Sequence, residues 1–216
     1  MRDSAARQMI IASACAMHSD GLTVANSGNI SVRREQGFLI TPSGVPYESL
    51  TPDQIVHLDD EGGHLSGKHK PSSEWRIHKD IYTFRPQTRA IVHAHAPHAT
   101  ALSVTRQALP AFHYMVALFG GHEVPCAAYA TFGTQALSAH VITALRHHNA
   151  CLMANHGMIS TADSLPLAYQ RALELESLCQ QYLLARQAGE VHLLSADEMA
   201  EAGAAFAVYG PEPDKS

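Results

Sequence analysis

Two histidines separated by one residue, His93 and His95, stand in an apolar run of the sequence, residues 90–96. Alternate residues of an extended strand point to the same face, so these two imidazoles would project side by side. Neutral imidazole nitrogens bind divalent metals such as zinc, which then need one or two further ligands. The chain has 15 histidines, so a pair of surface or hydrogen-bonded histidines is the alternative. His98 is out of phase with the strand, which places it outside the expected ligand set.

Two other positions could complete a metal site. His156 follows the apolar segment that begins at Ala150, and Gly157 beside it would let the backbone approach closely. The alternative for this segment is a simple turn. Glu74 is expected in the first turn of a helix that precedes the His93 strand. A carboxylate there is also favoured by the helix dipole alone.

The elements that must position these residues follow from hydrophobic periodicity and from Gly, Pro and hydroxyl signals. Strands are expected over 29–33, 38–40, 54–58, 90–96 and 150–160, the last interrupted at Gly157. Helices are expected over 5–17, 72–84, 134–147, 165–186 and 195–209, with a helical turn at Pro97. Residues 59–70 are expected to form an exposed turn, and a long irregular piece after the Pro97 turn is expected to run through Gly120 and Pro125 to Gly133. These elements predict one α/β domain over residues 1–216, with a central, mostly antiparallel sheet flanked by helices.

Composition narrows the class of protein. The 216 residues carry a formal charge of −5 and no long basic run, so neither nucleic acid nor a membrane surface is an expected partner. Apolar residues make up 46 % of the chain, yet no run is long enough to span a bilayer. The N-terminus lacks the apolar core of a signal peptide, so a cytoplasmic protein with a small-molecule partner is expected. The four widely spaced cysteines are expected to be buried thiols, Cys15, Cys126, Cys151 and Cys179.

Taken together, several spaced segments closely resemble the class II aldolase and adducin-head family, and among its members the L-fuculose-phosphate aldolases most. The matching segments are Ser27 to Arg33, Leu39 to Glu48, Pro71 to Arg76, His93 to His95, Phe112 to Met115, Tyr129 to Thr134 and Asn155 to Gly157. They occur in order along nearly the whole chain, which is far more specific than any one of them.

The resemblance implies a zinc ion held by His93, His95 and His156, with Glu74 as a fourth ligand when no substrate is bound. It implies that Glu74 is also the catalytic acid/base. The activity implied is reversible retro-aldol cleavage of a ketose 1-phosphate to dihydroxyacetone phosphate and a small aldehyde. Zinc is a Lewis acid that stabilises the negative charge formed when the carbon–carbon bond beside a carbonyl breaks. Manganese or cobalt could replace it, because this donor set suits several divalent ions.

A phosphate site is the second implied feature. Its residues are small or hydroxylated, and they would offer backbone N–H groups and a helix N-terminus to a phosphate: Gly28, Asn29, Ser43, Gly44, Ser72 and Ser73. Taken singly, each of these short stretches could be only a turn or a helix cap. Ser43 stands where the nearest relatives are expected to have threonine, and it keeps the hydroxyl.

The resemblance further implies a fourfold-symmetric homotetramer with active sites between subunits, and Tyr114 reaching in from a neighbour. Tyr114 and Tyr209 would exchange a proton with the oxygen on the aldehyde side. Phe132 would shape the aldehyde pocket. The alternative for both tyrosines is an ordinary half-buried ring, and Tyr209 lies close to a polar C-terminal end.

Other substrates and activities remain open. Related enzymes accept 5-deoxyribulose and 5-methylthioribulose 1-phosphates, and the apolar stretch from Met115 to Phe119 would suit an apolar aldehyde tail or the core. A sugar-phosphate epimerase of this fold uses aspartates, whereas position 74 is glutamate and no aspartate occurs between Pro97 and Ala162. Dehydratase and decarboxylase relatives share the Glu and His set. An adducin-type interaction module would lack the three histidines, so their presence favours an enzyme.

Overall fold

A sheet of eight strands forms the centre of the computed structural model, within the residues that it describes, 3–24 and 27–207. The strand order is β4-β3-β2-β1-β5-β8-β7-β6. The strands are β1 (Gly28–Arg33), β2 (Phe38–Ile40), β3 (Val56–Leu58), β4 (His64–Ser66), β5 (Ala90–Ala94), β6 (Cys126–Ala127), β7 (Ala150–Met153) and β8 (Gly157–Ala162). All neighbouring pairs are antiparallel except β6 and β7, which are parallel.

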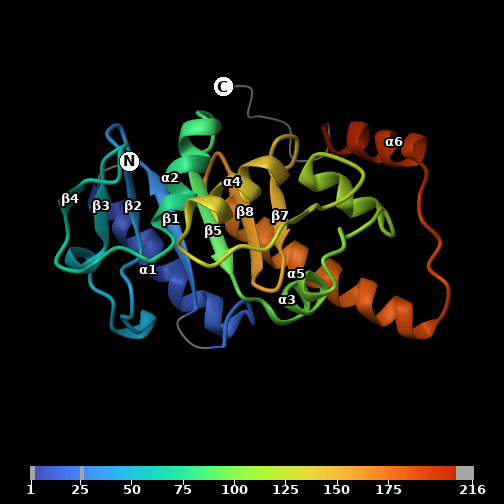
Figure 1. Ribbon diagram of the computed structural model, residues 1–216, viewed down its shortest axis with the longest axis horizontal. Coiled ribbons are helices and arrows are strands. Elements are labelled where there is room, and N and C mark those ends of the chain that lie inside the picture. Colours follow the sequence, from blue (N-terminus) through green and yellow to red (C-terminus); the bar gives the residue numbers. More distant parts are fainter. Residues whose placement is uncertain (1–2, 25–26, 208–216) are drawn as a thin grey trace, which may run out of the picture.

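Helices cover both faces of this sheet (Figure 1). They are α1 (Asp3–Ser19), α2 (Trp75–Phe84), α3 (Pro97–Val104), α4 (Gln135–Ala144), α5 (Leu165–Ala188) and α6 (Ala196–Ala207), with short 3₁₀ helices η1 (Tyr47–Ser49), η2 (Pro52–Gln54) and η3 (Tyr114–Phe119). In Figure 1, α2 and α4 lie in front of the sheet, and α1 and α5 lie behind it. The predicted fold class, a mostly antiparallel sheet flanked by helices, is confirmed.

Alternate residues of β5 pack in two different hydrophobic cores, one on each face of the sheet. Val92 and Ala94 pack in the core shared with α1, α3 and α5, whereas Ile91 packs in the core shared with α2 and α4. Successive residues of a strand point to opposite faces, so an all-apolar strand can serve both cores at once. His93 belongs to the same series as Ile91 and therefore lies on the α2 side of the sheet.

Some predicted elements are wrong in detail. The range 59–70 contains a strand, β4, whose three residues are exposed at the edge of the sheet, so no buried apolar alternation marks it. The range 150–160 is a hairpin of β7 and β8 rather than one interrupted strand. The chain reverses at Asn155, which takes a left-handed φ of 55°. Asparagine tolerates that conformation better than most residues.

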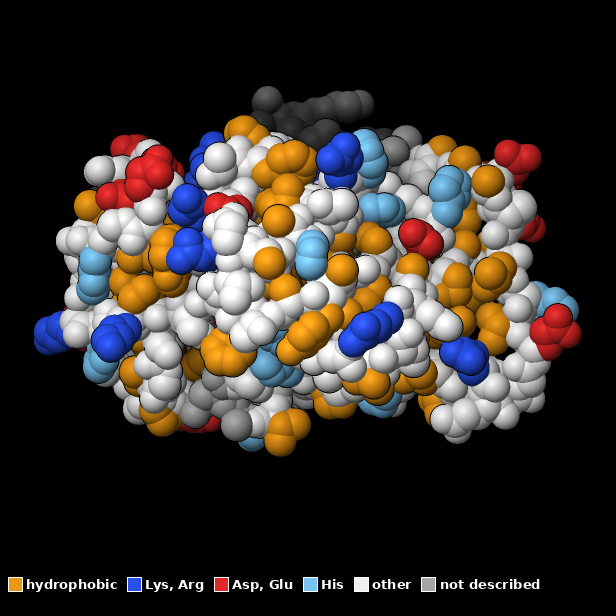
Figure 2. Space-filling model, in the orientation of Figure 1, with side chains coloured by type: hydrophobic (Ala, Val, Ile, Leu, Met, Phe, Trp, Pro, Cys, Tyr) orange, Lys and Arg blue, Asp and Glu red, His pale blue; other side chains and the backbone are white. Residues whose placement is uncertain are grey.

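Side-chain chemistry on the surface is mixed. On the face shown in Figure 2, lysine and arginine side chains are interspersed with acidic and apolar ones.

The four cysteines are free. Cys151 and Cys179 are buried, and Cys15 and Cys126 are half-buried. Among the described helices, none combines the length and the apolar character needed to span a membrane.

Candidate metal centre

Three histidines and one glutamate from separate elements meet beside the C-terminal end of β5. His93 lies on β5, His95 follows it directly, His156 lies in the turn between β7 and β8, and Glu74 is the N-cap residue of α2. One ligand atom from each residue lies within 4.8 Å of the others. The three imidazole rings have centroids 4.8 to 4.9 Å apart and meet edge to face.

The hydrogen bonds of His93 decide which of its nitrogens faces the cluster. Its Nδ1 lies 2.8 Å from the carbonyl oxygen of Met158, which can only accept, so Nδ1 carries a hydrogen. Nε2 then presents its lone pair to the Glu74 carboxylate at 3.0 Å and to His95 Nε2 at 3.1 Å. Electron-rich atoms this close need a proton or a metal ion between them.

The spacing of these atoms fits a metal ion. Four donors at about 2.0 to 2.1 Å from a tetrahedral zinc lie roughly 3.3 Å from one another. The His156 Nε2 to Glu74 Oε1 separation is 3.4 Å, close to that spacing. Glu74 Oε1 is buried and has no hydrogen-bond donor among the described residues. An acceptor left in this state is costly unless a cation satisfies it.

Burial and neighbouring charges shift the pKa values of the four residues in the cluster. Burial and the neighbouring His93 lower the pKa of His95 to about 4, and the same two causes lower the pKa of His156 to about 4. Burial lowers the pKa of His93 as well, but the Glu74 carboxylate outweighs it and leaves that pKa raised. Burial raises the pKa of Glu74, yet His93, His156 and a hydrogen bond from Asn29 bring it well below its usual range. At neutral pH the cluster therefore offers the neutral imidazoles of His95 and His156 and the Glu74 carboxylate.

Gly157 allows β8 to approach the strand end that carries His95. A β-carbon at this position would lie 2.4 Å from the carbonyl oxygen of Ala94 and 3.1 Å from His95 Cδ2. The first distance is shorter than real β-carbon contacts, and the atom it meets is backbone. The absence of a side chain is thus a requirement of the site geometry.

Gly157→Ala is expected to destabilise the protein by about 1–3 kcal/mol, because the strand pair must separate to admit the methyl group. Urea denaturation would measure the change in the free energy of unfolding. Gly203→Ala in α6 is the matched control, since nothing lies within 4 Å of a β-carbon there. Equal stability of the two variants would contradict the close approach.

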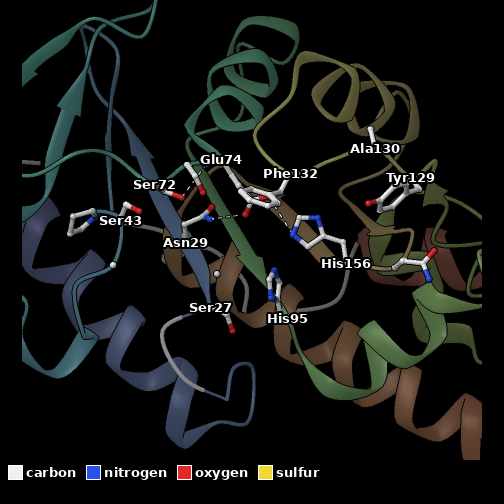
Figure 3. A pocket seen from close by; sticks show the side chains of 15 residues that line it. Ser27, Asn29, Ser43, Ser72, Glu74, His95, Tyr129, Ala130, Phe132 and His156 are labelled. Carbon is white, nitrogen blue, oxygen red and sulfur yellow. Dashed lines mark hydrogen bonds and ion pairs between the residues drawn. The ribbon is translucent and has the colours of Figure 1, made fainter.

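The cluster opens into a cavity of about 370 Å³. Its wall includes all six residues of the predicted phosphate site, together with Phe132 and the cluster members Glu74, His95 and His156. Figure 3 shows Glu74, His95 and His156 in the middle, with Ser43 and Ser72 toward one end and Tyr129 and Ala130 toward the other. No lysine or arginine is among the described residues that line it. The cavity thus has a neutral, hydroxyl-rich end and a more apolar end.

Two backbone donors are available at the hydroxyl-rich end. Gly44 has a φ of +72°, a conformation that glycine adopts without strain. Within the described residues, neither the Gly44 N–H nor the Ser73 N–H donates to another protein group. The Ser72 hydroxyl accepts the N–H of Glu74 at 3.3 Å just before α2 begins.

The tyrosines stand apart from this cavity. Tyr114 begins η3, is 51 % exposed and makes stacked ring contacts with His113 and Phe206. It does not line the cavity of its own chain. The stretch from Met115 to Phe119 does not line it either, and Phe119 is fully buried in the core. Tyr209 lies outside the described residues.

One histidine lies outside the site as predicted, and three residues that were not predicted line the cavity. His98 lies on α3, where its Nδ1 is 2.7 Å from Glu176, away from the cluster. Tyr129, Ala130 and Asn155 line the cavity although they were not predicted as site residues. All three lie within segments that carry the family resemblance, which is the signal that could have included them.

Comparisons with known proteins agree with this geometry. The model of the class II aldolase and adducin N-terminal domain matches residues 8–183. The 5-methylthioribulose-1-phosphate/5-deoxyribulose-1-phosphate aldolase of Rhodospirillum rubrum is 47 % identical over 190 residues, 88 % of this chain and 86 % of that protein. The L-fuculose phosphate aldolase of Escherichia coli K12 is 46 % identical over 210 residues, 97 % of each chain. A solved structure of an L-fuculose 1-phosphate aldolase superposes with a TM-score of 0.92 at 36 % identity, covering 96 % of this chain and 98 % of that one.

Proposed function

The chain belongs to the class II aldolase and adducin N-terminal domain family, and we propose that it is a metal-dependent aldolase acting on ketose 1-phosphates. It cleaves the sugar phosphate reversibly to dihydroxyacetone phosphate and a small aldehyde. The relatives named above are aldolases of L-fuculose phosphate and of 5-methylthioribulose and 5-deoxyribulose 1-phosphates. The observation that carries the proposal is the position of the histidine–glutamate cluster, between a neutral hydroxyl-rich end and an apolar end of one cavity.

We assign the metal to Glu74, His93, His95 and His156, with zinc as the ion and manganese or cobalt as substitutes. The bound ion would polarise the ketone and stabilise negative charge as the adjacent carbon–carbon bond breaks. Three neutral imidazoles from β5 and the β7–β8 turn suffice to hold the ion when Glu74 moves. The carboxylate is then free for proton transfer.

Glu74 is the proposed acid/base. Its carboxylate is 6 % exposed and lies at the boundary between the hydroxyl-rich end and the imidazoles. In the cleavage direction, Glu74 gives a proton to the carbon that becomes part of dihydroxyacetone phosphate; in the reverse direction it removes that proton. A carboxylate in a water-poor site is suited to both steps.

The phosphate group is proposed to lie at the hydroxyl-rich end. Backbone N–H groups of Gly44 and Ser73, serine hydroxyls and the N-terminus of α2 would surround it, with Ser43, Ser72, Gly28 and Asn29 completing the wall. The absence of lysine and arginine from the described lining fits recognition by neutral donors. Phe132, also in the cavity wall, is proposed to shape the space for the aldehyde.

We further propose a homotetramer in which Tyr114 serves the active site of a neighbouring subunit. Exposure of Tyr114 outside its own cavity supports a contribution in trans. Its phenol would exchange a proton with the aldehyde oxygen, with Tyr209 as a second candidate. A cytoplasmic location is proposed because the four cysteines are free, as is usual in a reducing compartment.

Mixing two inactive variants tests the shared site. His95→Ala and Tyr114→Phe subunits, each with low activity alone, are expected to recover activity when refolded or expressed together. In a cyclic tetramer with equal mixing, about a quarter of the sites would have both residues intact. If each site were built from one chain, every site would keep one defect, and no recovery would occur.

A retro-aldol assay tests the reaction itself. Purified protein is offered L-fuculose 1-phosphate, 5-deoxyribulose 1-phosphate and 5-methylthioribulose 1-phosphate, and release of dihydroxyacetone phosphate is followed by its reduction with NADH and glycerol-phosphate dehydrogenase. We expect release from at least one of them. Formation of an epimer, pyruvate or carbon dioxide instead would assign a different activity.

A further inference from the structure

A row of buried polar side chains leads from Glu74 away from the cavity. Asn29 Nδ2 lies 3.2 Å from Glu74 Oε2, and Asn29 Oδ1 lies 2.5 Å from His78 Nε2. His78 Nδ1 lies 2.6 Å from the hydroxyl of Ser31, which in turn lies 2.7 Å from that of Tyr82. All of these residues are buried, and His78 is fully so. We refer to Asn29, His78, Ser31 and Tyr82 as the Glu74 relay.

The relay follows from the spacing of residues on two elements. Asn29 and Ser31 alternate on β1, so they project from one face of the strand. Glu74, His78 and Tyr82 are four residues apart at the start and along the body of α2, so they lie on one face of the helix. Because α2 packs on the sheet, the side chains of these two sets come within hydrogen-bonding distance of each other.

The direction of every hydrogen bond in the relay is determined by its first member. An ionised carboxylate only accepts, so Asn29 must present its NH₂ group to Glu74 and its carbonyl oxygen to His78. His78 Nε2 must then carry the hydrogen, which leaves Nδ1 to accept from Ser31. The Ser31 oxygen therefore accepts the hydroxyl hydrogen of Tyr82. A flipped Asn29 amide would place its carbonyl against the carboxylate.

Burial keeps the His78 imidazole neutral, and its hydrogen-bond partners then select the tautomer. Removal from water, with the neighbouring His93, lowers the pKa of His78 to about 3, so its imidazole stays neutral at neutral pH. A neutral imidazole has one donor and one acceptor, which matches the two groups that it meets. In the direction that the Glu74 carboxylate sets, the Nε2–H of His78 donates to the Asn29 oxygen and its Nδ1 accepts from Ser31, so both ring nitrogens are satisfied.

We propose that His78 is a positioning residue: by fixing the amide of Asn29, it holds the Glu74 carboxylate in the orientation that serves the metal cluster and the proton transfer. This inference rests on the function proposed above for Glu74. His78 touches neither the cavity nor the cluster, and it acts only through Asn29. Outer partners that orient a metal ligand affect metal affinity or activity roughly 10- to 100-fold when they are changed.

Replacing His78 with glutamine or with asparagine tests whether His78 orients Asn29 or only fills space in the core. The amide of glutamine reaches the place of imidazole Nε2 and can still donate to Asn29, whereas that of asparagine reaches only the place of Nδ1, beside Ser31. We expect His78→Asn to lower kcat and to weaken zinc affinity of the metal-free protein, each roughly 10-fold or more. His78→Gln should stay close to wild type in both.

Ile81→Val is the control for a loss of packing, because Ile81 is fully buried on the same helix but outside the relay. Zinc affinity is measured by competition with a chromogenic chelator, and unfolding by urea denaturation of each variant. The inference is overturned if His78→Asn matches wild type, or if both amide variants fall together in line with their loss of stability, as Ile81→Val does. The zinc series is independent of turnover, so it tests the relay even if no ketose phosphate is cleaved.

Discussion

Replacing His95 with alanine is expected to abolish both stable metal binding and turnover. His95 Nε2 lies 3.1 Å from His93 Nε2, and its low pKa keeps it neutral and ready to bind a cation. Its loss leaves two imidazoles and one carboxylate, and Glu74 could no longer leave the metal without reducing the protein ligands to two. The loss of affinity should exceed the roughly 10- to 100-fold typical of outer partners. Metal analysis of the purified variant, together with the dihydroxyacetone phosphate assay, measures both effects.

His98→Ala is the matched control for this experiment. His98 lies three residues further along the chain and is also a histidine paired with a glutamate, Glu176, but it lies outside the cluster. We expect it to keep its metal and its turnover while losing some stability, because Glu176 also accepts N–H groups at the start of α3. A His95→Ala protein that retained a full complement of metal would contradict the assigned ligand set.

Glu74→Gln is expected to have the second largest effect, and a different one. Glutamine has the shape of glutamate, and the three imidazoles remain, so most of the metal should be retained. The variant cannot take up or give back a proton at the reacting carbon, and general acid–base groups contribute typically about 10²- to 10⁴-fold to the rate. The loss should therefore fall on kcat, by roughly that factor. Steady-state kinetics on metal-loaded protein would measure it.

Glu176→Gln provides the comparison, because it removes another poorly exposed carboxylate that pairs with a histidine. It should leave kcat largely unchanged in protein that remains folded. Wild-type turnover by Glu74→Gln would remove Glu74 from the proton-transfer role and leave it only as a possible ligand.

Much of the metal cluster could be predicted because its signals are local. The alternation of His93 and His95 required only extended backbone at these positions, and the structure has His93 on β5 with His95 directly after it, both in the cluster. The meeting of Glu74 and His156 with this pair is long-range. No spacing within the sequence encodes it, so the order of several family segments was needed to bring them together.

The errors have physical causes that can be named. Strands β7 and β8 are both buried on both faces, and the only polar residues between them are the pair Asn155 and His156, so no change of periodicity marks the reversal. The turn depends on the left-handed backbone of Asn155 and on the missing side chain of Gly157, neither of which a periodicity shows. Strand β4 was missed for the opposite reason, because its three residues are exposed and only Leu65 is apolar.

The Glu74 relay was visible in the sequence only in part. The four-residue spacing of His78 and Tyr82 indicates a buried helix face, yet a buried histidine on such a face has no evident partner until α2 is docked on β1. The proposed trans contribution of Tyr114 lies further still from local sequence patterns, because it would depend on a neighbouring subunit. Local sequence patterns thus predict helices, strands and ligands that are close in sequence. Contacts between residues of different elements follow only from the packing of those elements.

Titration of metal-free protein with zinc tests the central claim most directly, with release of dihydroxyacetone phosphate as the readout. The metal is first removed with a chelator, and a ketose 1-phosphate that the untreated protein cleaves is the substrate. We predict that the metal-free protein is inactive and that activity rises in proportion to added zinc until one ion is bound per chain, in agreement with the single cluster of the described residues. Full activity without a divalent metal would contradict the account.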